Sequence, residues 1–173
     1  ATMFTQGEAA PYDEAAVQTH LARKKAEAPL PCGCPGSQSR AIHREESPAP
    51  AGAVVSSQLR QWPVQIKLAP VNAPYFDGAH LLIAADCTAY AYGNFHQDFI
   101  RGKVVLIGCP KLDEGDYTEK LTQIIRQNDI KSLTIVRMEV PCCGGIQRAA
   151  TTALQHSGKF IPWQVVTLSV EGE

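Results

Sequence analysis

The sequence contains no apolar run that approaches the ~18 residues needed to cross a bilayer as a helix. Its first residues also lack the charged and apolar regions of a secretory signal peptide, so we expect a soluble, cytoplasmic protein. An excess of one charge is missing too, because 16 Lys and Arg stand against 17 Asp and Glu. We therefore expect neither nucleic acid nor a membrane surface as a partner.

Several signatures of catalysis and cofactor binding are absent as well. There is no Walker or dinucleotide fingerprint, and no Ser-His-acid set or carboxylate pair indicates hydrolysis. The Cys-x-x-Cys pairs of common zinc modules and the Cys-x-x-Cys-x-x-Cys run of ferredoxins do not occur. The chain does have six cysteines, and a cytosolic setting argues against stable disulfides between them.

Cysteines stand at the points where apolar, strand-like runs end. LLIAADC ends on Cys87, KVVLIGC on Cys109, and LTIVRMEVPCC on Cys142 and Cys143. If these runs are parallel strands of one open sheet, their carboxyl ends share an edge, and that edge is where α/β proteins bind ligands. Thiolates are soft ligands that suit iron–sulfur clusters, zinc and cuprous ions. The sequence therefore predicts a cysteine-held metal site, with an iron–sulfur cluster as the leading hypothesis.

The pattern of apolar residues predicts the fold class. Apolar positions at helical spacing occur in residues 117–125 and 146–154, between runs typical of buried strands. The predicted strands are residues 64–68, 80–85, 103–108, 132–140 and 164–170. Alternating strands and helices predict an α/β three-layer sandwich with a mostly parallel sheet of about five strands.

The chain divides into an appendage and a domain. Residues 1–56 are expected to hold a surface helix over 14–28, a rigid loop with Cys32 and Cys34, and a linker rich in Pro and Ala. Residues 57–173 are expected to form the cysteine-rich, cluster-binding α/β domain.

The vicinal pair lies between a predicted strand and a predicted helix, in the run Cys142-Cys143-Gly144-Gly145. The start of a helix lowers thiolate pKa values and favours an anionic cluster. The glycines allow close approach of the backbone to such a cluster. This run is also able to cradle a phosphate, but without a matching fingerprint that reading is the weaker one.

More than one ligand set is compatible with the sequence. Cys87, Cys109, Cys142 and Cys143 complete a tetrathiolate site for a [4Fe–4S] cluster. In a competing set, Cys32 or Cys34 replaces one member of the vicinal pair. Zinc takes the same ligands, so spacing alone does not select the metal. His96 is a weaker candidate ligand, because a structural histidine explains it more simply.

Several motifs taken together resemble those of a known family. The chain is similar over nearly all of its length to an uncharacterised family of 4Fe-4S ferredoxin-like proteins of anaerobes. The motifs are Cys32-Gly-Cys-Pro-Gly-Ser37, Ser56-Ser-Gln-Leu-Arg-Gln-Trp-Pro63, Leu82-Ile-Ala-Ala-Asp-Cys87, Val105-Leu-Ile-Gly-Cys-Pro-Lys111 and Met138-Glu-Val-Pro-Cys-Cys143.

The resemblance implies electron transfer in the cytoplasm of an anaerobe. Members of the family typically carry an N-terminal ferredoxin module with two [4Fe–4S] clusters. That module is not in this sequence, and residues 1–12 resemble the tail that follows it. A weaker likeness links Cys142-Cys143-Gly144 to the Cys-Cys-Gly element of heterodisulfide-reductase-type cysteine-rich domains, which hold clusters.

We therefore expect an iron–sulfur protein that passes single electrons to a redox partner, either a ferredoxin module or an oxidoreductase. Two alternatives stay open. A structural zinc-thiolate module would use the same thiols to stabilise the fold. A cluster- or thiol-dependent enzyme would act on a small substrate at an open coordination site. Electron transfer is favoured over catalysis.

Overall fold

The computed structural model describes Ala15 and residues 55–173. Four parallel strands form one sheet in the order β2-β1-β3-β4. The strands are β1 (His80–Ala85), β2 (Val104–Gly108), β3 (Ser132–Met138) and β4 (Trp163–Leu168). The predicted α/β class with a parallel sheet is confirmed.

Two longer helices join successive strands. Helix α3 (Thr118–Gln127) connects β2 to β3, and α4 (Gly144–Ser157) connects β3 to β4. Both bury the apolar stripes that predicted them, including Ile124 and Ile146, which are fully buried. Helix α4 ends where Gly158 takes a φ of 71°, a left-handed conformation that favours glycine and stops helices.

Shorter elements were not predicted, because one turn is too short to produce a periodic pattern. They are a 3₁₀ turn η2 (Pro74–Phe76), the short helix α2 (Thr88–Ala91), a π-helical turn η3 (His96–Ile100) and a 3₁₀ turn η4 (Pro141–Cys143). The helix predicted over residues 14–28 lies outside the described residues except for Ala15, which is helical and exposed.

The strand predicted over residues 64–68 is wrong. This segment pairs with β2 at a single bridge, between Gln65 and Ile107, and adds no fifth strand. The amides of Leu68 and Ala69 both turn back to the Gln65 carbonyl, each at 3.0 Å, so the chain leaves the sheet within one turn. Ile66 is nevertheless fully buried. The segment is irregular but buries one apolar side chain, and this gives residues 64–68 the apolar pattern of a strand.

Strands β3 and β4 end earlier than predicted. The residue Val140 precedes Pro141, and the chain there already enters the turn η4. Strand β4 stops where the Ser169 amide bonds to the Glu173 carbonyl at 2.8 Å, which closes a terminal turn. These turns place residues 139–143 and 169–173 beyond the carboxyl end of the sheet.

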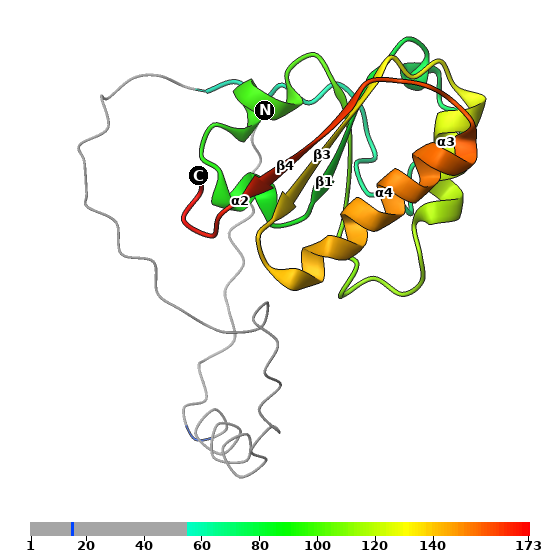
Figure 1. Ribbon diagram of the computed structural model, residues 1–173. Helices are drawn as coiled ribbons and strands as arrows, with labels where there is room; N and C mark the ends of the chain where they lie inside the picture. Colours follow the sequence, from blue (N-terminus) through cyan, green and yellow to red (C-terminus); the bar gives the residue numbers. More distant parts are fainter. Residues whose placement is uncertain (1–14, 16–54) are drawn as a thin grey trace. The chain divides into compact units, whose positions relative to one another are not determined.

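The direction of the crossovers sets the layers. The connection from β1 to β2 runs one way across the sheet, and the connections through α3 and α4 run the other way. Because such crossovers are right-handed, α2 and η3 belong to one face while α3 and α4 cover the other. Figure 1 shows α3 and α4 together on one side of the sheet. The three-layer arrangement encloses fully buried side chains of the central strands, such as Ile83 and Ile135.

The reversal of direction also creates a switch point between β1 and β3. In open α/β sheets the loops at the carboxyl ends of strands flanking such a point diverge, and the crevice between them is the usual ligand site. Over residues 55–173, no helix is both long and apolar enough to cross a membrane.

Candidate functional site

The structure brings four cysteines to the carboxyl end of the sheet. Cys87 follows β1 after one intervening residue and caps the start of α2, and Cys109 directly follows β2. Cys142 and Cys143 lie in η4, between β3 and α4. All four are free thiols.

These four cysteines line one cavity of about 350 Å³, named here the thiol cavity. The strands that precede Cys87 and the vicinal pair are β1 and β3, which flank the switch point. The rest of the wall is mainly apolar and consists of Lys111, Leu112, Met138, Val140 and Val170. Soft sulfur donors without carboxylate or carbonyl side chains suit a thiophilic metal rather than Mg²⁺ or Ca²⁺.

A proline sets the turn that carries the vicinal pair. Val140 is extended, with a ψ of 141°, as expected for a residue before Pro141. The Cys143 amide then donates to the Val140 carbonyl at 3.0 Å, and Cys143 caps α4. Only 6% of Cys143 is exposed, whereas Cys142 is half-buried and Cys87 is exposed. The thiols therefore differ in their access to solvent.

A carboxylate holds the loop that carries Cys109. The Asp113 carboxylate accepts a bond from the Cys109 amide at 3.4 Å and another from the Tyr117 hydroxyl. The Asp113 amide in turn donates to the Cys109 carbonyl at 2.9 Å. The bond from Tyr117 is the main cause of the lowered pKa of Asp113. Sequence reasoning missed this residue, although an aspartate four positions after a strand-end cysteine is a recognisable turn signal.

Two glycines beside the thiols are required by packing. A Cβ on Gly108 would lie 2.7 Å from the Tyr117 hydroxyl oxygen, and one on Gly145 would lie 2.8 Å from the Cβ of Pro110. A Cβ on Gly144 has room, since its nearest neighbour would be a guanidinium nitrogen at 3.8 Å. The close approach that explains Gly145 is therefore to the Pro110 loop, whereas the sequence suggested an inorganic cluster.

The expectation of lowered thiol pKa values at the start of α4 is wrong for Cys143. Burial raises the pKa of the Cys143 thiol and outweighs a backbone hydrogen bond that lowers it. The pKa of Cys87 is also raised, first by desolvation and then by the charges of Cys109, Asp86 and Cys142. Both thiols are therefore protonated at neutral pH, and a bound metal centre would have to displace their protons.

The spacing of the thiols does not suit a single metal ion. Among the side chains that the structure describes, no group of three or more His, Cys, Asp or Glu is arranged to hold one ion. Tetrahedral zinc with Zn–S bonds of ~2.3 Å would bring the sulfurs to about 3.8 Å from one another. An iron–sulfur cluster binds each thiolate to a different iron atom and so accepts a wider ring of donors. The donor type nevertheless fits a thiophilic centre.

The remaining candidate ligands do not join this site in the part of the chain described. Cys32 and Cys34 lie outside the described residues, so the ligand set that includes them stays a prediction. His96 is described, and its Nδ1 accepts a hydrogen bond from the Gln58 amide at 3.1 Å. It lines a separate, mostly apolar cavity that does not include the cysteines. His96 therefore has a structural explanation.

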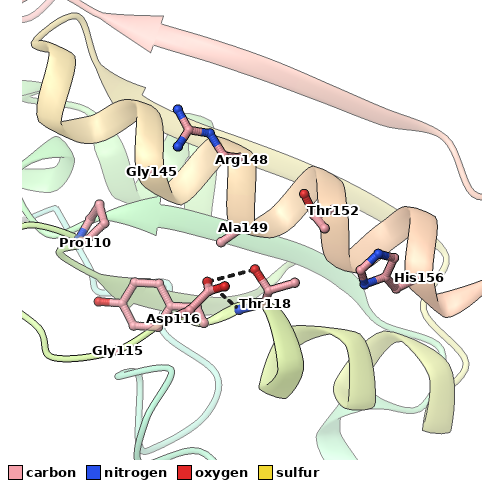
Figure 2. A pocket seen from close by; sticks show the side chains of 10 residues that line it. Pro110, Gly115, Asp116, Thr118, Gly145, Arg148, Ala149, Thr152 and His156 are labelled. Atoms are coloured by element: carbon pink, nitrogen blue, oxygen red, sulfur yellow. Dashed lines mark hydrogen bonds between the residues drawn. The ribbon is translucent and has the colours of Figure 1, made fainter.

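A second cavity, of about 440 Å³, opens between α3 and α4 and is named here the α3–α4 cavity. Figure 2 shows Arg148, Thr152 and His156 along α4 and Asp116 and Thr118 at the start of α3. The Asp116 carboxylate accepts from the amide and the hydroxyl of Thr118 at 3.0 and 2.8 Å. It therefore forms an Asx turn that leads into α3. Sequence reasoning missed this cavity, although the three α4 residues with polar side chains that line it, Arg148, Thr152 and His156, are spaced four apart.

Comparisons with known proteins identify a family and no activity. A family model described as a Rossmann-like domain matches residues 73–173. An uncharacterized protein of Archaeoglobus fulgidus is 35% identical over 116 residues, which cover 66% of this chain and 81% of that protein. No solved structure matches the chain. The region matched by the family model contains the whole sheet and every cysteine of the thiol cavity.

Proposed function

This chain belongs to the Rossmann-like domain family, and we propose that within this fold it is an iron–sulfur redox protein. Cys87, Cys109, Cys142 and Cys143 would hold the cluster, of which a [4Fe–4S] centre is the simplest form for four thiolates. The observation that carries the proposal is the thiol cavity, in which cysteines from three strand ends share one mainly apolar enclosure.

The residues of the chain would bind the cluster and shield it. The four thiols would give up their protons on binding, so loading would release protons and improve as the pH rises. Lys111 is the only cation that lines the cavity within the described residues, and its charge would offset part of the negative charge of the thiolates. Val140 and Val170, which are half-buried, would limit access of water. When bound, such a cluster supplies one-electron transfer, taking an electron from a reduced partner protein and giving it to an oxidised one.

The resemblance of the cysteine motifs to those of ferredoxin-like proteins points to the kind of partner. We propose a ferredoxin module or an oxidoreductase of an anaerobe as the donor or acceptor of the electron. The exposure of Cys87 and of Leu112, which is 81% exposed, supports this reading because both lie at the cavity. A partner that covers them would come close to the centre.

A cluster-dependent enzyme is the second candidate, and the unequal exposure of the thiols favours it over a zinc module. Cys143 is buried while Cys87 is exposed. If Cys87 were not a ligand, one iron would have an open position that faces solvent, where a small substrate could bind.

The test is the metal and sulfide content of the full chain, purified and reconstituted without oxygen. We expect a brown protein with about four iron and four sulfide per chain, and an electron paramagnetic resonance signal after chemical reduction. Zinc at one equivalent without sulfide would replace the proposal by a zinc module. A colourless protein without iron after reconstitution would overturn it.

Alanine substitution at each of the six cysteines assigns the ligands. Loss of iron in the Cys87, Cys109, Cys142 and Cys143 variants, with iron retained in the Cys32 and Cys34 variants, would support the proposed set. Loss of iron on changing Cys32 or Cys34, but not one of the vicinal pair, would support the competing set. Leu112→Ala is the control, because it changes the cavity wall without removing a donor. Circular dichroism of each variant separates ligand loss from unfolding.

A further inference from the structure

The two edges of the sheet differ in how their backbone groups are satisfied. At β2, the Gln61 side chain donates to the Val105 carbonyl and accepts from the Val105 amide at 3.5 Å. The Ile107 amide donates to the Val64 carbonyl at 2.8 Å, and the Ile107 carbonyl accepts from the Ile66 amide at 3.0 Å. Residues 61–66 therefore cover this edge.

The outer edge of β4 is open in the part of the chain that the structure describes. On the side of β4 that faces β3, the Pro162 and Leu168 carbonyls accept hydrogen bonds from the Leu133 and Glu139 amides at 3.0 and 2.8 Å. Because backbone groups alternate in direction along a strand, every second residue of β4 directs its amide and carbonyl away from β3. None of these outward groups has a partner among the described residues. The outward residues are Trp163, Val165 and Thr167.

Strand β4 also lacks the features that usually protect an open edge. Its sequence WQVVTL contains no charge, proline or glycine, whereas natural edge strands use such residues to prevent pairing with another chain. The side chain of Trp163 is 52% exposed, and that of Phe160, just before the strand, is fully exposed. An open, neutral and apolar edge is a surface for strand pairing.

We propose that β4 pairs with β4 of a second copy of this chain, antiparallel and about a two-fold axis at Val165. The four-stranded sheets of the two copies would then join into one continuous sheet. Val165 would lie opposite Val165 of the second copy, and Trp163 opposite Thr167 in both halves of the interface. All the outward amides and carbonyls of β4 would be satisfied in this register.

The self-complementarity of β4 favours a second copy over an unrelated strand. The register sets an aromatic residue, Trp163, against a β-branched one, Thr167, which is a favourable cross-strand pair. The chain before β4 carries Phe160 and Lys159, and the chain after it carries Val170 and Glu171. Antiparallel pairing brings the first segment of one copy toward the second segment of the other. The Lys159 ammonium already donates to the Asn128 carbonyl of its own chain, so the complementarity that favours a second copy is that of the β4 residues themselves.

Sedimentation of the full chain under reducing conditions, which exclude disulfide cross-links, tests the proposal. We expect a dimer that dissociates on dilution. Thr167→Pro removes one outward amide from each copy and leaves the bonds to β3 intact, as proline on an edge strand allows. It should weaken dimerisation by about thirtyfold or more, since two hydrogen bonds are lost. Thr167→Ala is the matched control, which retains the amide and should remain a dimer.

A second variant keeps the test valid if Thr167→Pro affects folding. Val165→Lys places two ammonium groups opposite each other at the two-fold axis and should give a monomer that is still folded by circular dichroism, with a lower melting temperature because Val165 packs partly against the core. A wild-type chain that is monomeric at the highest soluble concentration would overturn the proposal. So would a dimer that persists unchanged in Val165→Lys and in folded Thr167→Pro.

Discussion

The thiol cavity and the α3–α4 cavity are neighbours, yet they draw their side chains from different kinds of structure. Cys109 lines the first, and the next residue, Pro110, lines the second; in the same way Cys143 belongs to the first and Gly145 to the second. The thiol cavity takes its sulfurs from irregular turns that follow three strands. The α3–α4 cavity takes its polar groups from the regular turns of α4 and the start of α3.

This difference separates a candidate binding site from a structural junction. In the α3–α4 cavity, hydrogen bonds from Thr118 to Asp116 are the main cause of the lowered pKa of that carboxylate, so its oxygen is already in use. In the thiol cavity, burial raises the pKa of Cys143, so its sulfur holds a proton that a bound metal centre would have to displace. The thiol cavity is therefore the one to which we assign the proposed metal centre, whereas the carboxylate of the α3–α4 cavity is used in a turn before α3.

The largest expected effect is on metal content. Cys109→Ala should reduce bound iron and sulfide to background, because a tetrathiolate site has no spare donor. Thr152→Ala, which changes the wall of the neighbouring cavity, should bind iron as the wild type does. Iron analysis and visible absorbance after anaerobic reconstitution measure both. Equal loss in the two variants would remove the distinction between the cavities.

The next largest effect is expected on the stability of the fold, at the contact between Pro110 and Gly145. Gly145→Ala should destabilise the fold by about 1–3 kcal/mol, because its Cβ would overlap the Pro110 ring. Gly144→Ala is a matched control at the preceding position of the same helix, with open space for a Cβ. It should be neutral or stabilising by up to ~1 kcal/mol, since alanine favours helix over glycine. Urea unfolding of the metal-free protein gives both free energies, and equal values would contradict the overlap.

A smaller effect on stability is expected from Asp116, which lines the α3–α4 cavity just before α3. Asp116→Ala should cost about 1 kcal/mol of unfolding free energy, the usual net contribution of a hydrogen bond, because the Thr118 amide loses its carboxylate partner. Because the pKa of Asp116 is lowered in the fold, its charge contributes stability above the ordinary carboxyl pKa. That contribution is lost as the pH falls through the lowered value. The unfolding free energies of the wild type and of Asp116→Ala, measured with urea, should therefore converge from neutral to acidic pH. A difference that stays constant with pH would show that the charge of Asp116 does not contribute.

The smallest effect is expected on the stability of the metal-free protein at alkaline pH, where Cys143 of the thiol cavity loses its proton. The raised pKa of Cys143 means that the fold favours the protonated thiol. Its contribution to the stability of the metal-free protein is therefore complete below the ordinary thiol pKa and is lost as the pH rises through the raised value. Cys143→Ala should remove this alkaline loss. In the wild type, alkylation of Cys143 should need a higher pH than alkylation of an unfolded peptide thiol, and equal pH profiles would show that burial does not protect it.

Much of the fold was predictable because it depends on local patterns. The run at residues 80–85 coincides with β1, since a continuous apolar stretch is typical of a strand buried on both faces. Gly158 ends α4 in a left-handed conformation that favours glycine. The segment at 64–68 was predicted incorrectly because one buried side chain, Ile66, produces the same pattern in a turn.

The gathering of the thiols at one rim also follows from sequence, because cysteines placed after parallel strands must lie at one end of their sheet. The packing of the turns against one another decides how the thiols are spaced, how deeply each is buried and why the pKa of Cys143 is raised. The same is true of the Pro110–Gly145 contact and of the open edge of β4. Sequence by itself determined the strands, the helices and the end of the sheet to which the cysteines come. Only the tertiary structure decided their environment, because burial and contact distance arise between segments that are far apart in the chain.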